Sequence, residues 1–265
     1  MKSSMGLFLE NENIVIYGAG SVGKRFYQLL KEKKLAYKVV GFAETDCNEH
    51  VNELGVYVKK ISLYKRNYPI AIAVHYVLLT EMEENLKVLG FSNYKWIYPE
   101  LFDIAYGNPI KKNIDVSVIA LVKNSKNMYT NILYLLAIES IENENSVGLE
   151  LYRKYMKSFC SEQTTMLRIE YLKKRISEYK QNVIDDNYAI KLNNNKSIIL
   201  DGAHRVMLSY YYGIPLLKAD LYNATYEDYI NFSRTAVLDK NTIKTIYTGD
   251  EIELINDKCA EIKKV

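Results

Sequence analysis

Residues 13–30 read NIVIYGAGSVGKRFYQLL, and this stretch decides the fold of the first part of the chain. The apolar run at 14–17 is typical of a buried strand, and the residues after it are expected to turn and enter a helix. Gly18, Gly20 and Gly23 lie at this turn. Because glycine has no Cβ, it permits tight turns and a close approach of the backbone to another group. The stretch therefore predicts a strand, a glycine turn and a helix in succession.

A second strand is expected to end in Glu44, about twenty residues beyond the glycines, and a third apolar strand lies at 69–74. The order strand, Gly-x-Gly-x-x-Gly, helix, strand and acidic residue is the fingerprint of a dinucleotide-binding, Rossmann-like parallel sheet. In such a domain Gly18, Gly20 and Gly23 would form the phosphate loop. The carboxylate of Glu44 would bind a ribose hydroxyl.

Residues 12–105 resemble the small Rossmann-like domains that precede catalytic modules in bacterial sugar-nucleotide and capsule enzymes. The resemblance rests on the glycine turn and on a Leu-Gly-Val-Tyr-Val loop at 54–58. It leaves the ligand open among a nucleotide, a nucleotide sugar, NAD(P) and no ligand at all. The region is short for a self-sufficient dehydrogenase, and its Tyr27-x-x-x-Lys31 pair falls in the phosphate-loop helix, away from where hydride chemistry would need it.

The chain length of 265 residues agrees with two domains. A cluster of Gly, Pro, Asn and Lys at 106–113 predicts the boundary, with a nucleotide-binding domain at 1–108 and a helical connector plus second domain at 109–265. The elements expected next along the chain are an edge strand at 114–122 and helices at 128–141 and 147–159.

A second informative stretch, residues 198–215, reads IILDGAHRVMLSYYYGIP. It predicts a strand, a turn at Asp201 and Gly202, and a helix. The first amides of a helix lack partners within it, and with His204 and Arg205 beside them they would form a cradle for phosphate. Asp201 would act as a metal ligand or as a base. The plainer alternative is an ordinary turn in which Asp201 caps the helix.

The residues before this turn predict a helix followed by a hairpin. Apolar residues at 169, 172, 176 and 179 follow the helical repeat. Residues 188–192 and 197–200 have the pattern of two paired strands, and Asn193-Asn194-Asn195 is expected to supply their turn because Asn tolerates positive φ.

Residues 160–225 resemble the ParB/sulfiredoxin-like fold, an α+β domain with a strand, a DG-x-[HR]-R turn and a helix that ends in a Gly-Ile-Pro-like segment. The matching residues are Asp201-Gly202-Ala203-His204-Arg205 and Gly213-Ile214-Pro215. The set is most similar to the small-molecule kinase branch of this fold. The resemblance implies ATP or ADP with Mg²⁺ as the nucleotide, Gly202 and Ala203 at its phosphates, Asp201 at the metal, and Asp201, His204 and Arg205 as catalytic residues. The position of the histidine differs by one residue from that branch.

Other activities of the fold fit less well. Sulfiredoxins carry a catalytic cysteine where this chain has Ala203, so sulfinic acid reduction is excluded. Nucleic-acid-binding ParB proteins continue into a helix-turn-helix domain, and the residues after Gly213 show no clear recognition helix. Similar domains also occur among proteins of bacterial surface-polysaccharide clusters.

Composition limits the remaining choices. The formal charge of +3 is too small, and the lysines too scattered, to favour nucleic-acid binding. Three widely spaced cysteines argue against a disulfide framework, and no apolar run is long enough to span a membrane, so we expect a cytoplasmic protein. A homodimer stays an open alternative.

The sequence thus predicts a phosphotransferase that acts on a small hydroxylated metabolite, in the setting of surface-polysaccharide synthesis. Two other classes stay open. One is a non-catalytic protein that binds a nucleotide or nucleotide sugar, and the other is a ParB-type nucleic-acid-binding protein or nuclease.

Overall fold

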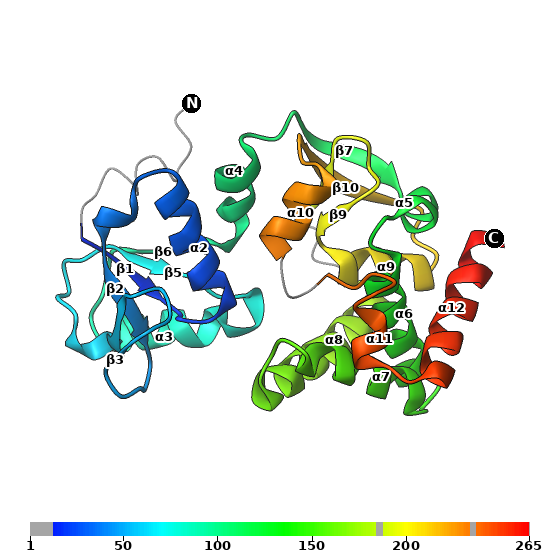
Figure 1. Ribbon diagram of the computed structural model, residues 1–265, viewed down its shortest axis with the longest axis horizontal. Coiled ribbons are helices and arrows are strands. Elements are labelled where there is room, and N and C mark those ends of the chain that lie inside the picture. Colours follow the sequence, from blue (N-terminus) through cyan, green and yellow to red (C-terminus); the bar gives the residue numbers. More distant parts are fainter. Residues whose placement is uncertain (1–12, 184–187, 234–236, 265) are drawn as a thin grey trace. The chain divides into compact units, whose positions relative to one another are not determined.

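A computed structural model describes residues 13–183, 188–233 and 237–264. The chain divides into two compact units, Met1–Gly107 and Asn108–Val265, one residue from the expected boundary. Both are mixed α/β in architecture (Figure 1). Among the described residues, no helix is long and apolar enough to cross a membrane.

The first unit contains a six-stranded sheet in the order β3-β4-β2-β1-β5-β6. All neighbouring strands are parallel except β3, which pairs antiparallel with β4 at the edge. The strands are β1 (Ile14–Tyr17), β2 (Val39–Glu44), β3 (His50–Val51), β4 (Tyr57–Lys60), β5 (Ile70–Ile72) and β6 (Tyr94–Trp96). The α-helices are α2 (Ser21–Glu32), α3 (Leu79–Val88) and α4 (Leu101–Tyr106), with short 3₁₀ turns at Ala36–Lys38, Ile61–Leu63, Tyr76–Leu78 and Tyr98–Glu100.

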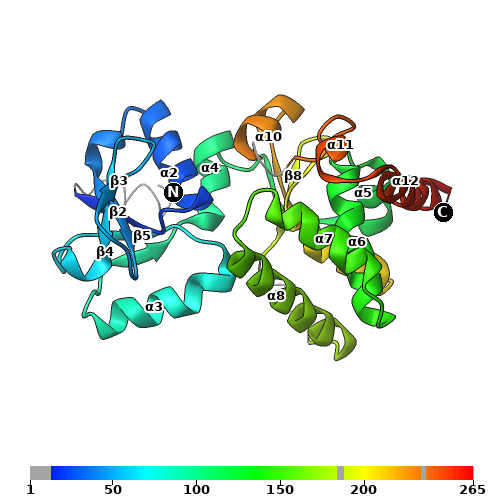
Figure 2. The same cartoon turned by 60° about the horizontal axis from the view of Figure 1, so that its bottom comes forward.

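Helices cover both faces of this sheet, with α2 on one face and α3 on the other (Figure 2). All four residues of β1 are buried, as the continuous apolar run predicts for a central parallel strand. Because successive side chains of a strand point to opposite faces, Val15 and Tyr17 share one cluster with Met82 and Leu86 of α3. The expected strand, glycine turn, helix and strand are therefore all present.

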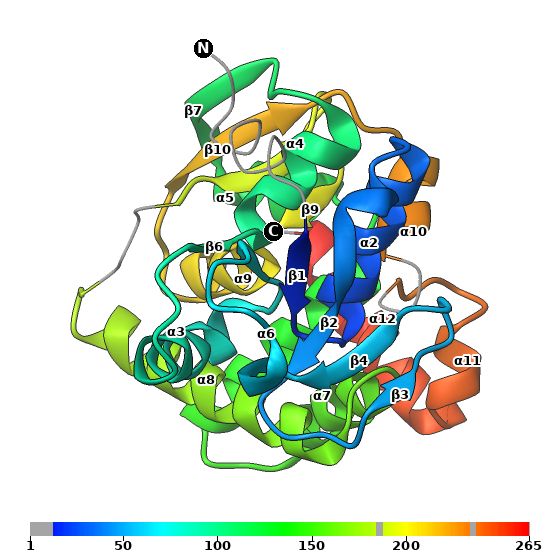
Figure 3. The same ribbon diagram turned by 90° about the vertical axis from the view of Figure 1, so that its left-hand side faces the viewer.

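The second unit contains a four-stranded sheet in the order β7-β10-β8-β9. Strand β10 pairs antiparallel with β7 (Figure 3) and parallel with β8, which in turn pairs antiparallel with β9. The strands are β7 (Lys111–Ser117), β8 (Ile190–Asn193), β9 (Ile199–Asp201) and β10 (Leu216–Tyr222). The helices are α5 (Val118–Asn124), α6 (Met128–Glu142), α7 (Val147–Lys157), α8 (Glu162–Lys180), α9 (Ala203–Tyr211), α10 (Tyr226–Ser233), α11 (Ile243–Ile246) and α12 (Gly249–Lys264).

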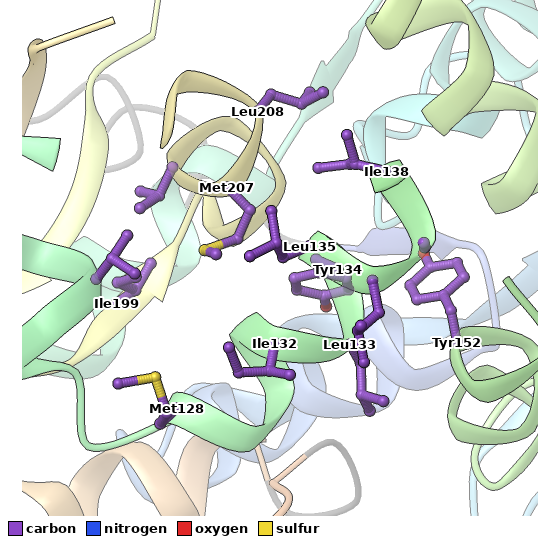
Figure 4. Packing of buried hydrophobic residues seen from close by; sticks show 14 of the residues in the cluster. Met128, Ile132, Leu133, Tyr134, Leu135, Ile138, Tyr152, Ile199, Met207 and Leu208 are labelled. Atoms are coloured by element: carbon purple, nitrogen blue, oxygen red, sulfur yellow. The ribbon is translucent and has the colours of Figure 1, made fainter. Parts of the chain in front are cut away.

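Helix α6 forms the centre of the second unit. Its residues from Ile132 to Ile138 are all buried, which fits a helix that is apolar on every side. It packs against α7, α9 and α12. Residues from these helices and from the sheet join one hydrophobic core, part of which is drawn in Figure 4.

Two local predictions were wrong. The edge strand expected at 114–122 ends at Ser117, and the rest is helix α5, because the Ser117 hydroxyl accepts a hydrogen bond from the Ala120 amide and caps a new helix. The hairpin of β8 and β9 is present, but its residue with positive φ is Lys196 and not an asparagine. The side chain of Asn193 instead accepts hydrogen bonds from the amides of Ser197 and Ile198, both at 2.9 Å.

Candidate functional site

The turn between β9 and α9 is built around Gly202. Its φ of +93° lies in the left-handed region, which side chains other than glycine rarely adopt. A Cβ at this position would lie 2.6 Å from Cγ2 of Ile190 in the neighbouring strand β8. The position therefore requires glycine both for its backbone conformation and for its space.

Helix α9 begins without a side-chain cap. Gly202 is its N-cap residue and has no side chain that could bond to the first amides. The first bond of the helix joins the Val206 amide to the Gly202 carbonyl, so the amides of Ala203, His204 and Arg205 have no acceptor within the helix. The N-cap position that the plainer alternative gave to Asp201 is thus occupied by Gly202. Amides at the positive end of a helix suit an anion.

The guanidinium of Arg205 folds back over this turn. Its Nη2 atom lies 3.2 Å from the position that a Cβ on Gly202 would take. Its Nη1 atom donates to the carbonyl of Tyr188, which holds the side chain in place. Because a cation at a helix N-terminus opposes the helix dipole, Arg205 adds to the preference of this turn for negative charge.

Asp201 is the last residue of β9 and stands opposite Lys191 of β8. Burial raises the pKa of Tyr134 on α6 to about 12. The negative charge of Asp201 also raises this pKa. Within the described part of the chain, no group of three acidic, His or Cys side chains could hold a metal ion. A Mg²⁺ ion bound here would thus have Asp201 and phosphate oxygens as its ligands, a donor set that Mg²⁺ accepts.

His204 points away from the turn into a cluster of tyrosines. Its Nε2 atom lies 3.1 Å from the hydroxyl of Tyr152, and its ring centroid is 4.0 Å from that of Tyr134. Burial lowers the pKa of His204 to about 3, and the charges of Arg168 and Arg175 lower it further. The side chain is therefore neutral at physiological pH. The expectation that His204 adds positive charge beside Arg205 needs correction.

The tyrosines of this cluster come from two helices that precede the turn by more than forty residues. Figure 4 shows Tyr134 on α6 and Tyr152 on α7, with Met207 of α9 packed against α6. Both rings are buried, and burial also raises the pKa of Tyr152, so both hydroxyls stay protonated. The cluster of His204, Tyr134 and Tyr152 is therefore uncharged at physiological pH.

A buried asparagine fixes the strand that leads into the turn. The side chain of Asn127 donates to the Ile199 carbonyl at 3.1 Å and accepts from the Ile199 amide at 3.4 Å. It also donates to the Tyr229 hydroxyl. Sequence reasoning missed Asn127 together with both tyrosines, because each is far from the turn in sequence and no local motif marks it.

The glycine turn of the first unit has a different geometry. Gly18 has a φ of +115°, and a Cβ there would lie 2.7 Å from the Ala73 carbonyl oxygen that follows β5. A Cβ on Gly23 would lie 1.9 Å from the Gly18 oxygen. Gly20, by contrast, has nothing within 4 Å of its Cβ position, and it is the N-cap residue of α2, which has no side-chain cap. Gly18 and Gly23 are thus closely packed against neighbouring backbone, whereas the Cβ position of Gly20 is open.

Glu44 ends β2, next to the glycine turn in the sheet. Strand β2 pairs with β1, and the Gly18 amide donates to the Ala43 carbonyl at 2.9 Å. The side chain of Glu44 is partly exposed. Gly18, Gly20, Gly23 and Glu44 therefore lie at or just beyond the carboxyl ends of the adjacent parallel strands β1 and β2.

Comparisons of the chain with protein-family models, with curated proteins and with solved structures give no match.

Proposed function

We propose that the second unit is a nucleotide-dependent phosphotransferase of ParB/sulfiredoxin-like fold, and that it acts on a small hydroxylated metabolite. The observation that carries the proposal is the turn at Gly202, where the uncapped end of α9, the Arg205 guanidinium and the Asp201 carboxylate occur within five residues. Such an arrangement combines an anion cradle with a group that takes up a proton.

In this proposal the phosphates of ATP bind the amides of Ala203 to Arg205 and the Arg205 guanidinium. The acceptor hydroxyl attacks the terminal phosphorus, its proton passes to Asp201, and the bond to the bridging oxygen breaks to release ADP. Because phosphoryl transfer depends mainly on positioning and on electrostatic stabilisation, a fixed cradle and a single carboxylate suffice as protein groups. In the alternative in which Asp201 is a metal ligand, it would hold Mg²⁺ together with the phosphates, and the ion would neutralise charge on the transferring group.

The neutral His204 takes a positioning role. Through its contact with Tyr152 it anchors the first turn of α9 to α7, and so orients the amides of that turn. The charge that the sequence assigned to it is supplied at the turn by Arg205.

We further propose that the first unit is a Rossmann-like domain that binds a nucleotide, a nucleotide sugar or NAD(P). Its parallel strands run in the order β4-β2-β1-β5-β6, and the connection reverses direction between β1 and β5. Ligands of open α/β sheets bind at such a switch point, beyond the carboxyl ends of the strands. The glycine turn with its open Gly20 follows β1 directly.

A turnover assay tests the phosphotransferase proposal. Purified wild-type protein, Asp201→Asn and Arg153→Ala are incubated with labelled ATP, Mg²⁺ and pools of hydroxylated metabolites, and labelled product and ADP are measured. Arg153 is a suitable control because it lies on the surface of α7 and pairs with Glu162. We expect Asp201→Asn to lose about 10²-fold or more in rate, as for a general base, with Arg153→Ala unchanged. Tight nucleotide binding without turnover in any pool would favour the alternative of a non-catalytic binding protein.

A further inference from the structure

Helices α7 and α8 carry eight cationic side chains, and seven of them pair with a carboxylate. Arg153 and Lys157 pair with Glu162, Lys154 with Glu251, Lys173 with Glu170, Lys174 and Arg175 with Glu178, and Lys180 with Glu142. The eighth is Arg168, for which no described carboxylate lies within ion-pair distance. This exception is notable because Arg168 is partly buried and not fully exposed on the surface.

The contacts of Arg168 are weak ones. Its Nη1 atom lies 3.7 Å from the sulfur of Met156, and its guanidinium carbon lies 6.0 Å from the centroid of the Phe159 ring. A thioether is a poor hydrogen-bond acceptor, and an aromatic face offers only a modest cation–π attraction at this distance. Among the described residues, most of the five guanidinium donors therefore have no strong acceptor.

The charge of Arg168 acts on the tyrosine cluster beside the Gly202 turn. It lowers the pKa of His204, and it counteracts the effect of burial on the pKa values of Tyr134 and Tyr152. Geometry gives the same location, because Met156, which Arg168 contacts, lies one helical turn after Tyr152 on the same face of α7. Asp201 also acts on Tyr134.

A partly buried cation without a counter-charge does not stabilise a fold, because its loss of hydration is not offset. Arginine is, however, well suited to bind carboxylates and phosphates through two parallel hydrogen bonds. We propose that Arg168 binds an oxyanion, a carboxylate or a phosphate, on the acceptor substrate beside the Tyr134–Tyr152–His204 cluster. The acceptor is then an acidic hydroxylated metabolite. The assignment of this anion to the acceptor substrate rests on the proposed phosphotransferase function. Anion binding by Arg168 does not depend on that function.

The test compares wild type with Arg168→Gln, Arg168→Lys, Arg205→Ala and the control Lys173→Gln. Lys173 is an exposed cation on the same helix and pairs with Glu170, so its substitution removes the same charge without touching the site. Melting temperatures are measured in sodium phosphate and in sodium acetate against sodium chloride of equal ionic strength. We expect an anion-dependent rise in wild type and in Lys173→Gln. A rise should also remain in Arg205→Ala, which weakens only the Gly202 turn and leaves Arg168 in place. In Arg168→Gln the apparent affinity should fall by about tenfold or more, and in Arg168→Lys by less, since lysine keeps the charge but not the paired donors.

The comparison of phosphate with acetate shows which kind of oxyanion Arg168 binds. A response to phosphate alone indicates a phosphate ester, and a response to acetate indicates a carboxylate. The absence of either response in wild type, or an equal response in Arg168→Gln, would overturn the proposal.

The melting temperature in chloride buffer distinguishes a binding role of Arg168 from a structural one. The binding of Mg²⁺-ATP distinguishes the Arg168 site from the nucleotide site. In chloride buffer Arg168→Gln should melt at the same temperature as wild type or higher, whereas Arg175→Gln, which breaks an ion pair, should melt lower. Binding of Mg²⁺-ATP should be unchanged in Arg168→Gln, and its loss would assign Arg168 to the nucleotide and overturn the acceptor role. If wild type binds phosphate through Arg168 but binds no nucleotide, the proposed phosphotransferase function is wrong, and the proposed anion site at Arg168 is retained.

Discussion

The two glycine turns of this protein share a plan and differ in chemistry. In each, a strand ends, glycine bends the chain, and a helix begins without a side-chain cap. Gly18 and Gly20 precede α2, Gly23 lies in its first turn, and that first turn has no acidic residue. The turn before α9 has one glycine, flanked by Asp201 and by the guanidinium of Arg205. In the proposed function, the turn before α2 would hold a ligand through its backbone, and the turn before α9 would also supply groups that take part in a reaction.

The largest expected difference between the turns is in stability. Gly202→Ala places a Cβ at positive φ and 2.6 Å from Ile190, so we expect it to lower the free energy of unfolding by about 2–4 kcal/mol. Gly20→Ala is the matched control, because Gly20 has a φ of −75° and open space at its Cβ position. It should change stability by less than about 1 kcal/mol. Denaturant unfolding curves measure both, and equal effects would show that Gly202 is not held as described.

The second turn should also make stability depend on pH. The pKa of His204 is about 3 in the folded chain, against 6.5 as its ordinary value, so the unfolded chain binds the extra proton between these two values. The stability that neutral His204 contributes is thus complete above pH 6.5 and is lost as the pH falls toward 3. Below pH 6.5 we expect a loss that approaches about 1 kcal/mol per pH unit.

Unfolding curves at pH 7.5, 6.5 and about 5.5 measure this loss, in a range where most carboxylates keep their charge. His204→Gln should flatten the dependence, and His50→Gln, at an exposed position, should not. An unchanged slope in His204→Gln would mean that the imidazole is not buried against Tyr134 and Tyr152.

Ligand binding tests the proposed role of the glycine turn before α2. Gly20→Asp should keep the fold, because Asp is a favourable N-cap residue and the Cβ position is open. Its carboxylate would repel a phosphate at the start of α2. We expect the affinity for whichever nucleotide, nucleotide sugar or nicotinamide cofactor stabilises the first unit to fall by about tenfold or more. Gly20→Asn, of equal size and without charge, should lose less, and equal losses would argue against a phosphate at this turn.

Sequence reasoning worked where the signal is local. The apolar run of β1, the glycines that follow it and the apolar helix α6 all form as predicted. It failed at Ser117, where a short apolar run suits either a strand or a helix and a single cap decides. Both the position of the two turns and the types of residue they carry were predicted from the sequence.

The charge of His204 could not be predicted in the same way. It depends on Tyr134 and Tyr152, which lie on two other helices and meet the imidazole only in the folded unit. The same reason hides Arg168, whose lack of an ion pair becomes visible only when the partners of its neighbours on α7 and α8 are known. Sequence patterns identify which residues are charged, and only the fold determines which charges are compensated.

The most direct test of the phosphate site at the second turn is a calorimetric titration of Mg²⁺-ATP into wild type, Arg205→Ala and Arg153→Ala. Arg205 stands over the Gly202 turn, whereas Arg153 carries the same charge on the surface of α7. We predict binding by wild type and Arg153→Ala, and an affinity lower by about tenfold or more in Arg205→Ala. Equal affinities in all three proteins, or no binding by wild type, would contradict the assignment of the β9–α9 turn as a nucleotide phosphate site.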